Sequence, residues 1–590
     1  MSALQALTTT QAQQLEEAIR LLNAGNASAA VAISARVVAA APLAPDAQHL
    51  HALCCADMGD AEAAERAFQR ALALAQQPPL ILRNYVAFLC KSGLSALAAG
   101  LRVPALAVLE RAVQLQPDSA LAWHALGNAQ RMADDLEAAE VAFRKAIALT
   151  PGYATAWVNL GAIVRLLGRS DEAITCYEQA VKAGYVGPDL TDALTGVLID
   201  VGRVGEALVQ ARRVTREHPE FVPAHTTLAN LLWEYGSTGV ASDSAFLAAV
   251  HAQPGNSALR LAFAQFLLAS RQADAALEQI RLLKAQEPSP VLIALEADAL
   301  EMLGHTDQAG ALYAQAHRQL GGDDPVFLNT YARHLLRAGE WQAAAERATE
   351  ATMLDPGKQE AWANLATAWR LLGDPREFWL CDYQRLITMV DIETPPEFAT
   401  TAEFLAALTQ TLEALHTAKR EPVQQSLRGG SQTAGRLFGR RDPIIEATRL
   451  ALRQAVERWL ATLPSDASHP FLKRKARSVR FSGSWSVRLW SSGNHVNHIH
   501  PQGWMSSAFY VALPPSVTEQ ASESSNAGYI KFGQPPQELN LNLPPRRLLR
   551  PEPGKLALFP SYLWHGTVPF VDDAARLTVA FDMIPSQDSP

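Results

Sequence analysis

The sequence predicts a multidomain α + β protein in which a helical repeat array precedes a small all-β domain of the jelly-roll type. The composition changes along the chain. Residues 10–375 are rich in Ala and Leu with prolines at intervals, whereas residues 480–590 are rich in Trp, Phe, Ser, Pro and Gly. The helical part also has an internal period. With 590 residues the chain is too long for one hydrophobic core, because most domains hold roughly 100–150 residues.

The internal period of the helical part is 34 residues. Residues of the same kind recur at this spacing in Trp123/Trp157, Leu126/Leu160, Gly127/Gly161, Ala139/Ala173, Phe143/Tyr177, Ala146/Ala180 and Pro117/Pro151. The phase continues through Leu194, Ala207 and Pro219, slips by one residue at Pro254, and resumes at Pro288 and Pro356. This pattern is typical of stacked pairs of antiparallel helices. Ala and Gly allow close contact, aromatic residues fill the gap to the next pair, and proline ends the second helix.

The repeated pattern resembles the tetratricopeptide repeat over most of residues 11–374. The resemblance implies a solenoid with a concave groove that binds a protein or peptide. The alternative is that the helices only space or dimerise the C-terminal part. We place the repeat domain at residues 1–374.

A bridging segment follows the repeats, because the 34-residue phase is lost after residue 386. Amphipathic helices are predicted at residues 404–418 and 443–463. The glycine-rich, basic stretch 425–443 lacks the residue order of a phosphate-binding loop, so we expect an ordered loop there. We therefore expect a helical bridge at residues 375–470, packed on a final domain at residues 471–590.

From Val479 onwards the sequence has the pattern of β-strands. Short runs rich in β-branched and aromatic residues, separated by Pro, Gly, Ser and Asn, are SVRFSGSWSVRLW, SAFYVALP, GYIKFG, GKLALFP and ARLTVAFDMI. Short strands with irregular connections favour an antiparallel jelly-roll, whose mouth can hold a ligand.

Histidines are concentrated in the segment GNHVNHIHPQGWMSS, which contains His495, His498 and His500. In an extended segment His498 and His500 face the same side, because the strand period is two residues. His565, at the end of a separate strand, is the natural source of a third imidazole. Three imidazoles suit iron, zinc, copper or nickel and leave coordination positions open. We expect His498, His500 and His565 to bind a metal. A two-histidine centre with water, and a shifted register that uses His495 or His500 as the proximal ligand, remain open.

A candidate anion site follows on the strand RLTVAFD. Arg576, Thr578, Ala580 and Asp582 share one face of this strand. A buried guanidinium needs an anion, and its fork suits a carboxylate, to which the Thr578 hydroxyl can add a hydrogen bond.

The segments HIHPQGWMSSAFYVALP and PGKLALFPSYLWHGTVPF, with the RLT strand, resemble bacterial 2-oxoglutarate/Fe(II)-dependent oxygenases that carry N-terminal tetratricopeptide repeats. The resemblance covers roughly residues 400–585. It implies a double-stranded β-helix that binds Fe(II) through His498 and His565. It also implies that Arg576 and Thr578 bind the co-substrate 2-oxoglutarate, with Tyr510 as a further contact. The implied reaction converts 2-oxoglutarate and O2 to succinate and CO2 while a substrate C–H bond is hydroxylated.

The chain departs from this family at the acidic metal ligand, where it has His500. The replacement removes one negative charge from the ligand set. Two other functions are therefore weighed. A cupin-type metalloprotein usually has a Glu soon after its HxH pair, but the next Glu here is Glu519. A non-catalytic interaction protein with a degenerate oxygenase domain is supported by His500.

Composition limits the remaining functions. The net charge of −8, from 51 basic and 59 acidic residues, argues against nucleic-acid binding. The five cysteines form no CxxC pair, which fits a reducing compartment. No uninterrupted apolar stretch reaches about 18 residues, so we expect a cytoplasmic protein without membrane contact.

Overall fold

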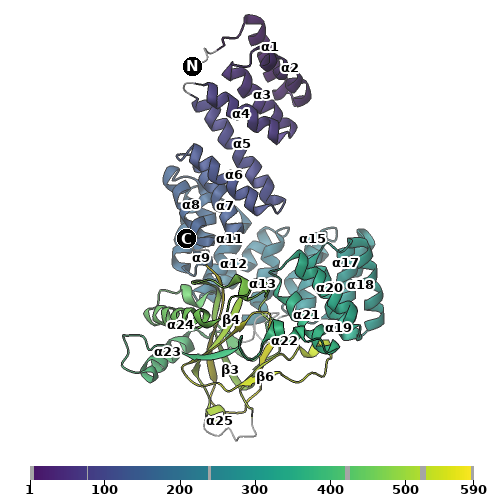
Figure 1. The fold of residues 1–590 in the computed structure, drawn as a ribbon, viewed down its shortest axis with the longest axis vertical. Coiled ribbons are helices and arrows are strands. Elements are labelled where there is room, and N and C mark those ends of the chain that lie inside the picture. The colour runs from purple at the N-terminus through teal and green to yellow at the C-terminus, as the bar shows by residue number, and fades with distance from the viewer. Residues whose placement is uncertain are drawn as a thin grey trace. The chain divides into compact units, whose positions relative to one another are not determined.

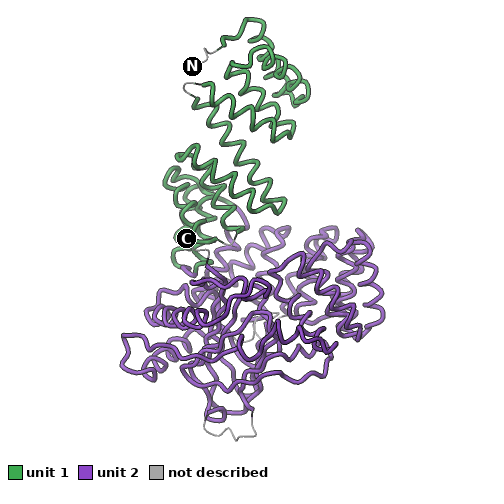
Figure 2. Tube along the Cα trace, viewed as in Figure 1, with its two compact units in different colours: residues 1–167, 171–186 green, residues 168–170, 187–590 purple. Residues whose placement is uncertain are grey.

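The computed structural model describes residues 5–75, 78–133, 135–236, 241–418, 425–518 and 526–586 (Figure 1). The chain divides into two compact units, residues 1–167 with 171–186 and residues 168–170 with 187–590 (Figure 2). Glu519, which bears on the cupin alternative, lies outside the described residues. The predicted fold class is confirmed: helical repeats precede an antiparallel β domain.

The first unit consists of consecutive antiparallel helices. They are α1 Thr9–Asn23, α2 Ala27–Ala40, α3 Pro45–Met58, α4 Ala61–Leu74, α5 Pro79–Ala98, α6 Arg102–Leu115, α7 Ala120–Met132, α8 Leu136–Leu149, α9 Ala154–Leu166 and α10 Ser170–Lys182. The periodic glycines lie where the paired helices touch. A Cβ atom on Gly127 would lie 2.8 Å from Cε1 of Phe143 on the next helix. The small residues therefore allow the close contact that the sequence predicts.

The periodic prolines have a second role besides ending a helix. In five repeats, the side chain six residues after the proline contacts the proline carbonyl and closes the turn between repeats. These contacts are Trp123 to Pro117 at 2.8 Å, Trp157 to Pro151 at 2.9 Å, His225 to Pro219 at 3.0 Å, Arg260 to Pro254 at 3.3 Å and Trp362 to Pro356 at 3.0 Å. The hydrogen bond explains why a donor side chain follows each of these prolines at the same spacing.

The second unit begins with further helices of the repeat array. They are α11 Pro188–Asp200, α12 Val204–Glu217, α13 Val222–Tyr235, α14 Ser244–Ala252, α15 Ser257–Ala269, α16 Ala273–Gln286, α17 Pro290–Met302, α18 Thr306–Leu320, α19 Pro325–Ala338, α20 Trp341–Leu354, α21 Gln359–Leu372 and the short α22 Arg376–Cys381. No helix in the described parts of either unit combines the length and the apolar character needed to cross a membrane.

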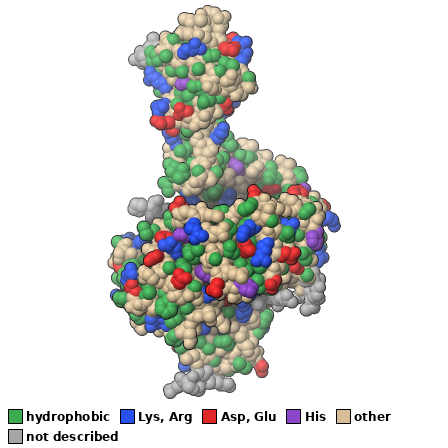
Figure 3. Space-filling view, turned by 90° about the vertical axis from the view of Figure 1, so that its right-hand side faces the viewer, with side chains coloured by type: hydrophobic (Ala, Val, Ile, Leu, Met, Phe, Trp, Pro, Cys, Tyr) green, Lys and Arg blue, Asp and Glu red, His purple; other side chains and the backbone are tan. Residues whose placement is uncertain are grey.

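The β domain of the second unit has two antiparallel sheets. Its strands are β1 Thr388–Asp391, β2 Leu427–Gln432, β3 Val479–His495, β4 Met505–Ala512, β5 Ile530–Phe532, β6 Arg547–Leu549, β7 Lys555–Pro560, β8 His565–Thr567 and β9 Arg576–Pro585. The larger sheet has the order β1-β7-β4-β9-β3-β2, and the smaller has the order β6-β5-β8. The remaining helices are α23 Thr401–Leu415, α24 Pro443–Thr462 and α25 Pro515–Thr518, with 3-10 turns at Leu437–Gly439, Leu472–Arg474 and Gln537–Leu539. Figure 3 shows basic and acidic side chains interspersed over one face of the molecule.

Residues 375–470, expected to be helical, contain two strands as well as helices. β1 pairs with β7 and β2 pairs with β3, so both belong to the larger sheet. β2 falls in the stretch expected to be a loop, because its two glycines hide the strand pattern. The pairing of β2 with β3 shifts register between Arg428 and Gly430, and Gly429 has φ +64°. The domain boundaries after residues 374 and 470 remain predictions.

We predict that Gly430→Ala destabilises the second unit by about 1–3 kcal/mol, the usual cost of overpacking. The new Cβ would lie 2.4 Å from the backbone oxygen of Arg488, which cannot move without disturbing β3. Urea unfolding measures the change. Gly205→Ala is the control, because its Cβ meets open space. Equal stability of both variants and the wild type would contradict the packing described here.

Candidate metal centre

The backbone brings His498 and His565 side by side. The amide of His498 donates to the carbonyl of His565 at 2.9 Å, and the amide of His565 donates to the carbonyl of His498 at 3.0 Å. The amide of His500 donates to the carbonyl of Ser561 at 3.1 Å. The HxH segment after β3 is therefore extended along the chain that leads into β8. This pairing places both of its imidazoles beside the third.

The three imidazoles form one cluster. One possible ligand atom from each of His498, His500 and His565 lies within 4.8 Å of the others. Ring centroids are 4.2 Å apart for His498 and His565, and 5.0 Å apart for the other two pairs. The Nε2 atoms of His498 and His500 are 3.1 Å apart. The structure thus brings together the three residues expected to bind a metal, while their role as ligands remains a prediction.

Each imidazole is oriented by an acceptor at Nδ1. His498 donates to the carbonyl of Val496 at 2.8 Å, and His565 donates to the carbonyl of Leu563 at 2.9 Å. His500 donates to Oδ1 of Asp582 at 2.6 Å. A hydrogen on Nδ1 leaves the lone pair on Nε2, which is the arrangement of metal-binding histidines in proteins.

The cluster fits a metal cation. Burial lowers the pKa values of His498 and His565 well below the ordinary value, and the neighbouring histidines lower them further. Both imidazoles are therefore neutral near pH 7. The Nε2 atoms of His498 and His500 are 3.1 Å apart. A cation at the usual distance of about 2.1 Å from a histidine nitrogen could bond to both.

His495 lies beside this cluster and is not one of its three members. Its Nδ1 contacts Oγ of Ser426 at 2.9 Å, and the same hydroxyl lies 3.2 Å from Nε2 of His498. Burial lowers the pKa of His495 to about 3, with the positive charge of Arg576 as the next cause. Of the open alternatives, the geometry favours the three-histidine group over a register that uses His495.

The predicted anion site is buried, and its positive charge acts on His495. Arg576 is only 2% exposed, and its guanidinium carbon lies 5.2 Å from the centre of the Tyr510 ring. One guanidinium nitrogen donates to the carbonyl of Gly528 at 2.7 Å. Tyr510 on β4 pairs in register with Thr578 on β9, so the three predicted co-substrate residues lie on two adjacent strands.

Two buried polar atoms of this site are not fully paired. Among the described residues, Nε of Arg576 and Oη of Tyr510 make no hydrogen bond of good geometry, although the two side chains interact with each other. A buried donor left unpaired costs about 1–3 kcal/mol, and more when it is charged. Both atoms are donors, so the missing partner is an acceptor, and a carboxylate fits best because it also neutralises the guanidinium.

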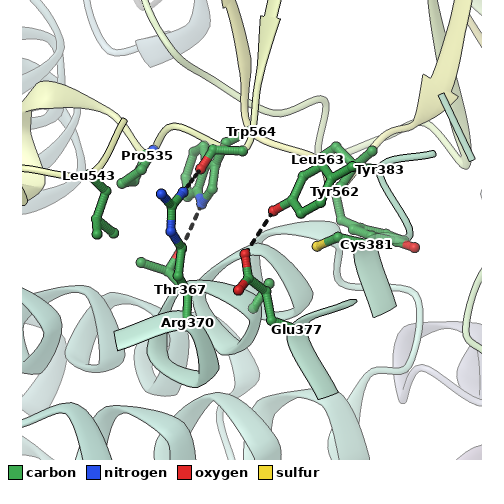
Figure 4. Close-up of a pocket in the computed structure, with 12 residues that line it drawn as sticks. Thr367, Arg370, Glu377, Cys381, Tyr383, Pro535, Leu543, Tyr562, Leu563 and Trp564 are labelled. Carbon is green, nitrogen blue, oxygen red and sulfur yellow. Dashed lines mark hydrogen bonds between the residues drawn. The ribbon is translucent and has the colours of Figure 1, made fainter. Parts of the chain in front are cut away.

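The residue before His565 is anchored to the repeat array. Trp564 Nε1 donates to Oγ1 of Thr367 on α21 at 2.9 Å, as Figure 4 shows. The carbonyl of Trp564 accepts from the amide of Gly533 at 2.8 Å, and Arg370 on α21 donates to the carbonyl of Gly533 at 2.6 Å. The cavity between these groups measures only about 10 Å³, enough for roughly one water. It belongs to the junction between α21 and the β domain and is too small for a ligand.

We predict that Thr367→Val lowers the free energy of unfolding by about 1–3 kcal/mol, because the buried indole N–H loses its acceptor. In a Trp564→Phe background the same substitution should cost much less, since the donor is already gone. Urea unfolding of the wild type and the three variants measures the coupling. Strictly additive losses would show that this hydrogen bond does not join α21 to the strand of His565.

Sequence reasoning missed the partner of His500. Asp582 was recognised only as a residue on the same strand face as Arg576. Its contact with His500 spans 82 residues of chain, and only the folded strands reveal it. The available signal was the period-two pattern of RLTVAFD, which places an acidic residue on the face of the candidate site.

Comparisons with known proteins agree with this architecture. A family model described as "Putative 2OG-Fe(II) oxygenase" matches residues 483–582. Tetratricopeptide repeat models match residues 45–78, 90–154 and 137–188. The comparison with curated proteins gives no match.

Several solved structures are similar to parts of the chain. Pseudomonas aeruginosa PilF is 16% identical, with 37% of this chain and 95% of that chain covered and a TM-score of 0.30. MamA from Desulfovibrio magneticus RS-1 is 24% identical, with 30% and 95% covered and a TM-score of 0.25. Yeast Tom70 is 13% identical, with 62% and 90% covered and a TM-score of 0.35. The chain thus combines tetratricopeptide repeats with a C-terminal domain that matches the 2OG-Fe(II) oxygenase family model.

Proposed function

We propose that the protein is an Fe(II)- and 2-oxoglutarate-dependent dioxygenase that hydroxylates a C–H bond of its substrate. The observation that carries this proposal is the neighbourhood of two complementary sites. Three imidazoles bring one possible ligand atom each within 4.8 Å of the others, and the buried guanidinium of Arg576 lowers the pKa of His495, whose ring centroid lies 5.7 Å from that of His498. One site suits a cation and the other suits a carboxylate.

In this proposal His498, His500 and His565 hold Fe(II). The bound metal, when present, supplies the redox chemistry that converts 2-oxoglutarate and O2 to succinate and CO2. The protein's part is to hold the metal ligands still, which their Nδ1 hydrogen bonds do. Burial on the β domain also excludes water from the reacting groups.

Arg576 and Thr578 bind the carboxylate of 2-oxoglutarate that lies farther from the metal. Arg576 supplies the charge, and Thr578 adds a hydroxyl from the same face of β9. Burial raises the pKa of Tyr510, so its phenol keeps its hydrogen near pH 7 and can donate to the same carboxylate. Paired donors of this kind fix the orientation of the bound acid as well as its affinity.

The repeats would recruit the substrate or a partner, which we propose to be a protein or peptide bound in the solenoid groove. The proposal rests on the family matches of the repeats alone. We also propose a cytoplasmic location, and no role in binding nucleic acid or membranes.

A second function is a non-catalytic interaction protein with a degenerate oxygenase domain. The observation that favours it is His500, which occupies the place of the acidic ligand. A cupin-type metalloprotein would use the histidines but would leave Arg576 and Tyr510 without a carboxylate to bind. Both alternatives predict that 2-oxoglutarate is not consumed.

We predict that the protein converts 2-oxoglutarate to succinate and CO2 only when Fe(II) and O2 are present. Without the substrate, ascorbate is added as the two-electron reductant that converts the second oxygen atom of O2 to water. His565→Ala should remove this turnover, because it removes a metal ligand. Arg576→Ala should weaken 2-oxoglutarate binding by roughly 2–5 kcal/mol, the cost of truncating one partner of a buried charge pair. Succinate formation and calorimetric titration of 2-oxoglutarate measure the two effects.

Matched controls are His218→Ala and Arg213→Ala, whose side chains are 42% and 55% exposed on the repeat array. Both should behave as the wild type. Arg576→Ala should still bind metal, whereas His565→Ala should not. Turnover that survives in both site variants, or none in the wild type with metal bound, would contradict the proposed dioxygenase.

A further inference from the structure

The three imidazoles leave the proposed site without a charged ligand. Neutral histidines do not offset the two positive charges of Fe(II), whereas the acidic ligand of the resembling family would offset one of them. A carboxylate nevertheless lies directly behind one of the imidazoles. Oδ1 of Asp582 accepts from Nδ1 of His500 at 2.6 Å, on the side of the ring opposite to Nε2.

The position of Asp582 is fixed by neighbouring strands. Its Oδ1 also accepts from Oγ of Ser506 at 2.6 Å, and Ser506 is the residue that pairs with Asp582 across β4 and β9. Oγ of Ser506 lies 2.8 Å from Oγ of Ser561, and both serines are fully buried. The backbone of Gly503 packs directly against this group of side chains, because a Cβ at that position would lie 2.4 Å from Oγ of Ser561.

Among the described residues, His500 is the one ionisable side chain that contacts the carboxylate of Asp582. Asp582 is 7% exposed, and among the described residues no Lys or Arg forms an ion pair with it. A buried carboxylate without a counter-charge is strongly unfavourable. A metal ion on Nε2 of His500 would supply the counter-charge through the ring. The site therefore contains one cation position and one buried anion, joined by a single imidazole.

We propose that Asp582, acting through His500, supplies the negative charge that the ligand set lacks. In this role Asp582 is a positioning residue that holds the tautomer of His500 and raises the basicity of its Nε2. The inference rests on the proposed function, because it concerns the same metal site. It assigns to this chain a carboxylate–histidine–metal arrangement in place of a directly bound carboxylate.

The first test is Asp582→Asn. The amide oxygen can still accept from Nδ1 of His500, so the substitution removes the charge and keeps the hydrogen bond. Anaerobic titration with Co(II), followed by its visible absorption, should show about 10–100-fold weaker binding, the usual effect of losing such a partner. Unchanged affinity would overturn the proposal.

Ser507→Ala is the matched control for structural damage. Ser507 is the neighbour of Ser506 on β4, is also buried, and donates to the carbonyl of Phe581 at 2.9 Å. Its removal disturbs the same pair of strands without touching a histidine. We expect a lower midpoint of thermal unfolding and unchanged Co(II) affinity. Equal weakening of Co(II) binding in Ser507→Ala and Asp582→Asn would show that strand packing, and not charge, is responsible.

The second test repeats Asp582→Asn in a His500→Asp background, where the loss of Co(II) affinity should disappear or become a gain. His500→Asp restores the acidic ligand and places it near Asp582. In that background the two carboxylates repel, so Asp582→Asn should leave Co(II) affinity unchanged or strengthen it. The same 10–100-fold loss in both backgrounds would overturn the proposal, because the charge would then not act through His500.

These tests separate the inference from the proposed function, because Co(II) affinity is measured without 2-oxoglutarate or O2. If Asp582→Asn weakens Co(II) binding and the wild type forms no succinate, the inference stands and the dioxygenase proposal fails. If the wild type forms succinate and Asp582→Asn binds Co(II) normally, the inference alone fails. A wild-type protein that binds no Co(II) overturns both.

Discussion

The candidate site depends on one short backbone pairing, the two hydrogen bonds between His498 and His565. These residues are 67 positions apart in the sequence. Their pairing is an isolated β-bridge and not part of a longer pair of strands. The bridge sets the distance between two imidazoles directly. Two residues later, the amide of His500 bonds to the carbonyl of Ser561, and the third imidazole lies in the same cluster.

A second constraint acts on the side chains, because the acceptors at Nδ1 differ in kind. Two are backbone carbonyls two residues before the histidine, so the chain that carries each of these rings also orients it. The third is the carboxylate of Asp582, which belongs to β9, the strand that also carries Arg576. One strand therefore contributes both the charge behind the metal position and the cation of the co-substrate position. Their separation is fixed by the rise along a single strand.

Much of this arrangement follows from local patterns in the sequence. The repeat helices follow from the 34-residue period. The structure explains why proline and tryptophan recur at fixed positions, because the indole of Trp157 donates a hydrogen bond to the carbonyl of Pro151. The shared face of His498 and His500 follows from the strand period. Features that depend on distant partners did not follow. β2 was missed because glycines at a bulge look like a loop, and the role of Asp582 was missed because only the fold reveals its partner.

The most direct measurement is a crystal structure determined anaerobically with Fe(II) and 2-oxoglutarate. Our account predicts one iron bonded to Nε2 of His498, His500 and His565 at about 2.1–2.2 Å. It also predicts one carboxylate of 2-oxoglutarate on the guanidinium of Arg576. An iron bound elsewhere, an iron bonded by Asp582 itself, or a 2-oxoglutarate that does not contact Arg576 would contradict the account.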